Sequence, residues 1–134
     1  MIRKIVSLFI VMILMFALGT TTVFADEKGM NYLYTRSCSS SLSISGLTAT
    51  CKSSLRGYYG LTTKIEVTQT LQVRDGNQWR QAKTWTATYY SHNCDLENTR
   101  TVYSGNTYRV MSEFKVYAGS SYETVYSYST TKTT

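Results

Sequence analysis

The stretch KIEVTQTLQVRDGNQWRQAKTWTATYY, residues 64–90, decides the fold of this chain. Apolar side chains alternate with polar ones in both of its halves, at Ile65, Val67, Leu71 and Val73 and then at Trp85, Ala87 and Tyr89. A period of two residues is that of a β-strand with one buried face. Because the turn Asp75-Gly76-Asn77 separates the halves, the stretch predicts a β-hairpin.

The same period recurs on both sides of this hairpin. Upstream, residues 42–51 alternate and bend at Gly46, which predicts a second, shorter hairpin. Downstream, residues 107–128 alternate around a turn at 118–120, which predicts a third. The tail, residues 129–134, has no apolar residue, and we expect it to fray.

Six or seven strands in successive hairpins, with no helical period after residue 26, predict an all-β fold. An antiparallel β-sandwich is the expected architecture, and a small β-barrel is the alternative. The segment SGNTYRV, residues 104–110, resembles the tyrosine corner of immunoglobulin-like domains, in which a tyrosine hydroxyl bonds to the backbone. The sandwich is therefore expected to be immunoglobulin-like.

The N-terminus has the layout of a secretory signal peptide. Arg3 and Lys4 precede an apolar run over residues 5–18, and Val23-Phe24-Ala25 forms a small-residue cleavage site. We expect residues 1–25 to be removed and residues 26–134 to form a single secreted, extracellular domain. No later segment approaches the roughly 18 apolar residues of a transmembrane helix, so none is expected after signal cleavage.

The chain is mildly basic, with 14 Lys and Arg against 8 Asp and Glu. The lysines and arginines are scattered along the sequence and do not cluster in one segment. Such a charge draws a secreted protein weakly toward anionic envelopes or glycans. Arg56 beside two tyrosines would suit single-stranded nucleic acid, but the small charge and the extracellular address argue against a nucleic-acid partner.

Three cysteines remain after processing, Cys38, Cys51 and Cys94. In an oxidising compartment they favour one disulfide and one remaining thiol, with the pairing left open.

Residues 91–97, SHNCDLE, are interpreted as a polar loop and hold the chain's single histidine. Cys94, His92 and Asp95 are the residue types of a nucleophilic pair with an orienting acid, but a spacing of two along one loop rarely produces that geometry. The loop lacks the C-x-x-C or H-x-x-x-H spacing of metal sites. We expect no catalytic residue, no metal and no cofactor, so the protein is not predicted to be an enzyme.

Tyrosine is the distinctive residue, with 12 in the chain. Its ring offers apolar area with a hydroxyl, as in many binding surfaces. A tyrosine row spaced by two is equally what one face of a structural strand looks like. The candidate binding residues are those of one loop and of the last predicted strand: Arg56, Tyr58, Tyr59, Tyr122, Tyr126 and Tyr128.

The chain resembles a family of small secreted proteins of Gram-positive bacteria, described as a domain of unknown function. The resemblance covers residues 26–134 and rests on residues 30–35, 38–45, 48–51, 63–71 and 105–110. It implies secretion and a sandwich-like fold, and no functional residue. The predicted function is a secreted, non-catalytic module that binds a glycan, the cell envelope or a protein. A small cationic effector, bacteriocin-like or membrane-active, is the alternative.

Overall fold

The computed structural model describes residues 32–134, and every regular element in this part of the chain is a strand. The predicted signal peptide, residues 1–25, lies outside the described residues. Within residues 32–134 there is no helix with the length and apolarity of a membrane span. The strands are β1 (Thr35–Ser45), β2 (Thr48–Gly57), β3 (Lys64–Asp75), β4 (Gln78–Tyr89), β5 (Asn93–Thr101), β6 (Thr107–Ala118), β7 (Ser121–Tyr128) and β8 (Lys132–Thr133).

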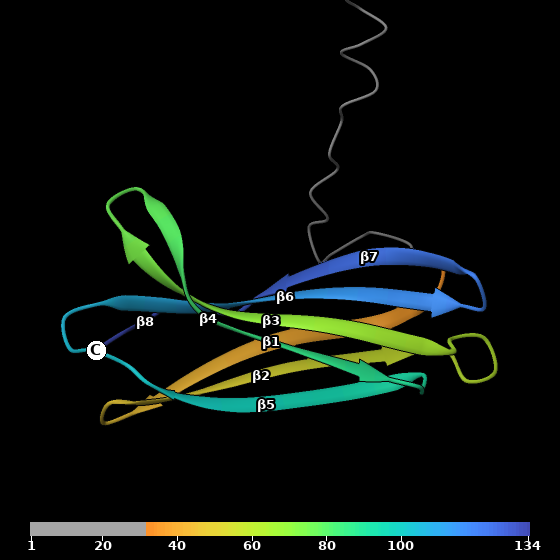
Figure 1. Cartoon of the computed structure of the whole chain (residues 1–134), viewed down its shortest axis with the longest axis horizontal. Coiled ribbons are helices and arrows are strands. Elements are labelled where there is room, and N and C mark those ends of the chain that lie inside the picture. Colours follow the sequence, from red (N-terminus) through yellow and green to blue (C-terminus); the bar gives the residue numbers. More distant parts are fainter. Residues whose placement is uncertain (1–31) are drawn as a thin grey trace, which may run out of the picture.

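These strands form two antiparallel sheets that face each other (Figure 1). One sheet has the order β1-β2-β5, and the other has the order β4-β3-β6-β7 with β8 also paired to β6. The prediction of an all-β fold with two antiparallel sheets is therefore confirmed. The barrel alternative is wrong, because the described strands stay in two separate sheets.

The three predicted hairpins are present, and each closes through a two-residue turn. The first turn residue is glycine every time, with positive φ: Gly46 at 57°, Gly76 at 62° and Gly119 at 64°. The second turn residue, which is not glycine, has no positive φ in any of the three, so the turns are of type II′ and not type I′; the twist of a type II′ turn matches the twist of paired strands. Local turn chemistry thus sets the register of all three hairpins.

Two expectations from the sequence are wrong. The tail does not fray, because β8 pairs with the start of β6 and the Thr134 amide donates to the Asn106 carbonyl at 3.0 Å. Backbone pairing of this kind needs no apolar side chain. Of the predicted loop over residues 91–97, only residues 91 and 92 connect strands, because β5 begins at Asn93 and pairs with β2 along its whole length.

The sandwich interior has two apolar clusters with a polar layer between them. One cluster includes Leu71 and Val110, and the other includes Leu55 and Phe114. The polar layer, which we call the polar belt, consists of the interior residues Ser40, Ser53, Gln69, Asn98 and Ser112.

Hydrogen bonds join the polar belt across the two sheets. The Ser112 Oγ lies 2.5 Å from the Ser40 Oγ and 2.6 Å from the Ser53 Oγ. Gln69 donates through Nε2 to Ser53 at 2.8 Å and accepts through Oε1 from Asn98 at 2.9 Å. No buried side-chain polar atom of residues 32–134 lacks a partner. A fully satisfied belt avoids the cost of burying an unpaired polar group.

The contact expected of a tyrosine corner is also present. Tyr108, at the start of β6, is only 3 % exposed. Its hydroxyl accepts a hydrogen bond from the backbone amide of Tyr103 at 3.0 Å. This bond fixes the connection between β5 and β6.

Candidate functional site

The order of the strands separates the cysteines. Cys38 on β1 and Cys94 on β5 both lie opposite Leu55 of β2, on its two sides. Two strand spacings, about 9.6 Å, therefore separate them, whereas a disulfide needs Cα atoms within about 7 Å. Cys51 lies on β2 four residues before Leu55 and belongs to the other apolar cluster. The structure forms no disulfide, so the expected bridge is wrong.

The Cys94 thiol is a core group. It is 2 % exposed and packs in the cluster of Leu55 and Phe114. Burial is the main cause that raises the pKa of Cys94 to about 12, so the thiol stays protonated at neutral pH. The ring of His92 packs edge-on against the ring of Tyr59, with centroids 5.4 Å apart. Within residues 32–134 there is no cluster of three or more His, Cys, Asp or Glu side chains that could hold a metal ion.

Arg56 lies on the outer face of the three-stranded sheet and ties β2 to β5. Its Nη2 donates to both carboxylate oxygens of Asp95 at 3.0 Å, and its Nη1 donates to the Cys94 carbonyl at 3.1 Å. The hydrogen bonds from Arg56, and then the one from Ser54, hold the pKa of Asp95 below its usual value. The donors of Arg56 are largely used within the protein, which leaves it a structural role.

Tyr58 and Tyr59 lie in the loop between β2 and β3, at one end of the sandwich. Thr62 anchors this loop, since its Oγ1 accepts from the Tyr58 amide at 3.0 Å and donates to the Tyr34 carbonyl at 2.6 Å. Tyr58 is 40 % exposed and Tyr59 is 90 % exposed. Gly57 allows the close packing here, because a Cβ at that position would lie 2.7 Å from the His92 carbonyl oxygen.

The tyrosine row of β7 lies on the outer face of the five-stranded sheet. Val125 and Ser127 point inward and are buried, whereas Tyr122, Tyr126 and Tyr128 are 55 %, 43 % and 42 % exposed. The row is therefore a surface feature and not part of the core. Near one end, the rings of Tyr122 and Tyr117 are 5.2 Å apart, and the Lys115 ammonium lies 5.5 Å from the Tyr122 ring.

At the other end, the row continues into a cation held between two aromatic rings. The Arg109 guanidinium carbon lies 4.3 Å from the Trp79 ring centre and 4.6 Å from the Tyr128 ring centre. The Arg109 Nε donates to the Gln72 Oε1 at 2.7 Å, and burial lowers the pKa of Arg109. Two cation–π contacts and this hydrogen bond fix the guanidinium in place. We call this surface the tyrosine face; its members are Trp79, Arg109, Lys115, Tyr122, Tyr126 and Tyr128.

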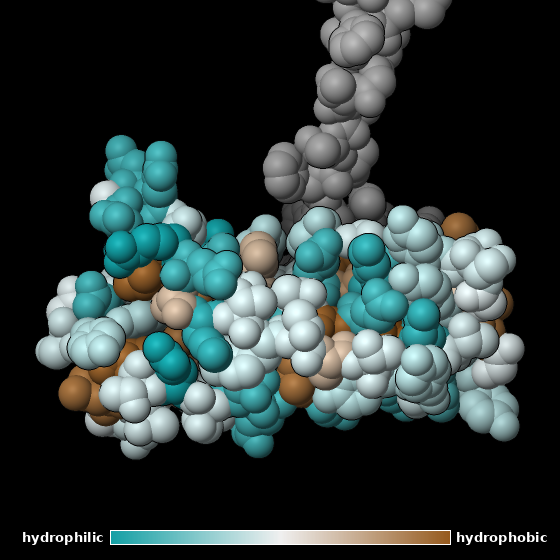
Figure 2. Space-filling model, viewed as in Figure 1, coloured by the Kyte–Doolittle hydropathy of each residue, from teal (hydrophilic) through white to brown (hydrophobic). Residues whose placement is uncertain are grey.

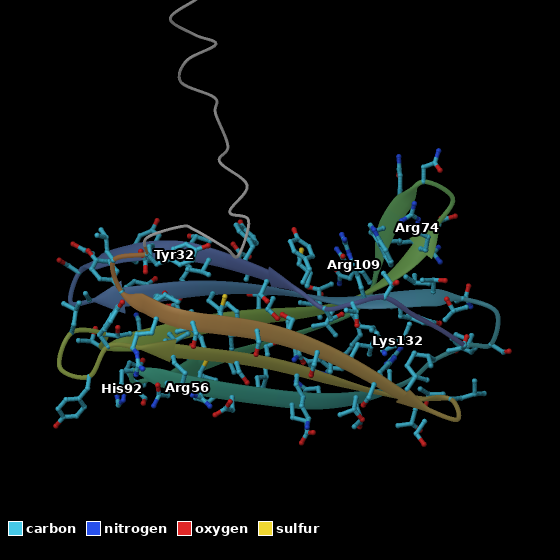
Figure 3. The ribbon with its side chains drawn as sticks, turned by 180° about the vertical axis from the view of Figure 1, so that it is seen from behind. Tyr32, Arg56, Arg74, His92, Arg109 and Lys132 are labelled. Atoms are coloured by element: carbon cyan, nitrogen blue, oxygen red, sulfur yellow. The ribbon has the colours of Figure 1, made fainter. Side chains whose placement is uncertain are left out.

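Reasoning from the sequence missed Trp79 and Arg109. Strand alternation puts Arg109 on the outer side of β6, but the position of Trp79 depends on the bend of the β3–β4 hairpin. The tip of that hairpin turns away from the three-stranded sheet (Figure 1), on the side where Figure 3 places Arg74 and Arg109. No local signal in the sequence reveals that bend.

The six predicted binding residues do not form one surface. Figure 3 shows Arg56 and His92 on one side of the sandwich and Arg109 on the opposite side. Tyr59 packs against His92, and the β7 row shares the side of Arg109. The structure therefore separates the loop candidates from the strand candidates. Comparison of the chain with family models, with curated proteins and with solved structures gave no match.

Proposed function

We propose that this protein is a secreted, non-catalytic module that binds an extended saccharide chain bearing anionic groups. The observation that carries the proposal is the tyrosine face, where the exposed rings of β7 lie beside Arg109 and Lys115 of β6. The carboxylate of Glu113 lies between these two cations and accepts a hydrogen bond from the Tyr126 hydroxyl at 3.2 Å, so the positive charge is at the two ends of the face. Tyr126 and Tyr128 are successive outward residues of β7 and lie about 7 Å apart, whereas Thr124 separates Tyr122 from Tyr126, which are about 13 Å apart. This spacing presents a line of rings to an extended polymer.

The chemistry of the face suits such a ligand. Aromatic rings contribute apolar contact area with little conformational cost, and the tyrosine hydroxyls can bond sugar hydroxyls. Arg109 and Lys115 supply positive charge for carboxylate or phosphate substituents. The guanidinium of Arg109 is already held by Trp79 and Tyr128, which lowers the entropy lost on binding.

We also propose that the sandwich is immunoglobulin-like. The arrangement of β1-β2-β5 opposite β3-β6-β7 corresponds to strands A-B-E opposite C-F-G of that fold, and the Tyr108 hydroxyl bond supports the assignment. The fourth strand differs from the constant-type arrangement, because β4 pairs with β3 and not with β5. Membership of the family of secreted Gram-positive proteins stays a prediction.

The test uses polygalacturonate as an anionic probe and its methyl ester as a neutral probe with the same backbone. We expect the protein to bind polygalacturonate more tightly than the ester. The double change Tyr126→Ala and Tyr128→Ala should weaken binding by about 1–3 kcal/mol, as expected for two aromatic contacts. Affinity measured by titration calorimetry checks this.

A matched control separates the tyrosine face from the loop end of the molecule. Tyr59→Ala removes an exposed ring that lies on the opposite side, so it should leave the affinity unchanged. If Tyr59→Ala weakens binding and the β7 double variant does not, the tyrosine face is not the site. A folded protein that binds neither probe contradicts the ligand class.

A further inference from the structure

A cavity of about 350 Å³ opens between the two sheets, beside the edge strands β4 and β5. Its floor is apolar and consists of members of one core cluster, Leu71, Val73, Val102 and Tyr108. Its rim is polar and includes Arg80 from β4 and Arg100 from β5. In Figure 2, brown apolar atoms surrounded by teal hydrophilic ones are visible at the foot of the projecting β3–β4 hairpin.

An irregularity in β4 accounts for the opening. The register pairs Leu71 with Lys83 and Gln72 with Gln81, so Ala82 is an extra residue that forms a β-bulge. A bulge bends its strand and increases the local twist. The hairpin beyond the bulge turns away from the three-stranded sheet (Figure 1), and Ala82 itself lines the cavity. The two sheets are thus left uncovered at this edge.

The two arginines of the rim are available to a ligand. Arg80 and Arg100 are both exposed, and neither makes an ion pair or a side-chain hydrogen bond with any residue of the described chain. Arg56 and Arg109, by contrast, are held by Asp95 and by Gln72. Guanidinium groups recognise carboxylate and phosphate through paired hydrogen bonds.

We propose that this cavity binds a small amphiphilic anion. Its carboxylate or phosphate contacts Arg80 and Arg100, and its apolar body lies against Val102 and Tyr108 between the sheets. The cavity volume is at the lower end of the range for small-molecule sites, which suits a short acyl chain or a single aromatic ring. The cavity lies apart from the tyrosine face, so the proposal of an anion in the cavity and the proposal of a saccharide on the tyrosine face can be tested independently.

The experiment compares three probes on the purified chain: octanoate, octanol and acetate. Octanol has the apolar chain without the charge, and acetate has the charge without the chain. We expect octanoate to bind at least about tenfold more tightly than either, because it alone satisfies both parts of the cavity. Titration followed by NMR shifts of Ala82 and Val102 measures both affinity and location.

Three variants test the assignment of residues. R80Q and R100Q should each weaken octanoate binding by about tenfold, the loss expected for one charge-assisted contact. R36Q makes the same charge change on β1 and should have no effect. A82W fills the cavity from the bulge and should abolish binding while the unfolding transition is retained. The proposal is overturned if octanol binds as tightly as octanoate, or if R36Q weakens octanoate binding as much as R80Q and R100Q do. It is also overturned if the NMR signal of Ala82 does not shift up to about 1 mM octanoate.

Discussion

At the scale of single residues, tyrosine has two opposite roles in this protein. Tyr108 is buried and ties a loop through its hydroxyl, whereas Tyr59 is almost fully exposed. The same side chain serves both roles because it combines a large apolar ring with one polar group. In the buried Tyr108 the hydroxyl supplies a structural hydrogen bond, whereas in the exposed Tyr59 the ring is accessible from solvent.

Replacing Tyr108 by Phe removes only the hydroxyl and leaves the Tyr103 amide without this partner. We expect the free energy of unfolding to fall by about 1–2 kcal/mol, the usual cost of losing a partly buried hydrogen bond. Urea unfolding measures the change. Tyr103→Phe is the control, since Tyr103 is 73 % exposed, and it should change stability by less than about 0.5 kcal/mol. Equal effects of the two variants would argue against the corner.

At the scale of elements, the strands are joined through the polar belt as well as through apolar packing. Ser112 on β6 lies within hydrogen-bond distance of Ser40 on β1 and of Ser53 on β2. The belt therefore links the two sheets at the middle of the sandwich. Such a network also opposes a register shift, since a slip by one residue would turn Ser112 out of the interior.

Ser112→Ala should lower the free energy of unfolding by about 1–3 kcal/mol, because it leaves buried hydroxyls with fewer partners. Ser53→Ala should have a similar effect. The double variant should cost less than the two single costs combined, with a coupling of at least about 0.5 kcal/mol. Ser43→Ala, on the exposed side of β1, is the matched control. Strict additivity of Ser112 and Ser53 contradicts the network.

The short strand β8 gives a second prediction at this scale. The Thr134 carbonyl accepts from the Gly105 amide at 3.1 Å, so Gly105 should be protected from hydrogen exchange. Deleting residues 131–134 should remove that protection and leave the amide of Val116, at the other end of β6, unchanged. Rapid exchange of Gly105 in the intact chain would restore the expectation of a frayed tail.

At the scale of the whole molecule, the order of the strands controls the cysteine chemistry. Cys38 and Cys94 lie on strands that flank β2, and Cys51 lies in the other half of the core. No movement of side chains alone can bridge these distances. The strand order therefore leaves no two cysteines of one chain placed to form a disulfide.

Alkylation without a reductant should add three groups to the unfolded protein, as intact mass would show. In the folded protein Cys51 and Cys94 should react slowly, since burial raises their pKa to about 11 and about 12. Below the ordinary pKa of 9.0 these thiols are protonated in both the folded and the unfolded protein, so the full stability is present there. As the pH rises from 9.0 toward about 11 the unfolded thiols ionise before the folded ones, and the free energy of unfolding falls. Urea unfolding between pH 7 and 10 should show this fall. An intact mass two units lower before reduction than after it would indicate a disulfide and would contradict the prediction of three thiols.

The sequence by itself determined the three hairpins of this protein and their turns. Side-chain alternation along a strand and the φ of Gly76 are local properties, so residues 64–90 were sufficient to predict their hairpin. The polar interruptions at Gln69 and Ser112 were also present in the sequence. Their role in the polar belt became evident only from the partners that other strands bring to them.

Only the tertiary structure decided the positions that depend on distant parts of the chain. It placed Arg109 between Trp79 and Tyr128, turned the β7 tyrosines outward, separated the cysteines and paired the tail with β6. The physical reason is common to all four. The alternation of polar and apolar residues predicts which residues share one side of a strand. The order and the bend of the strands decide which other residues that side contacts.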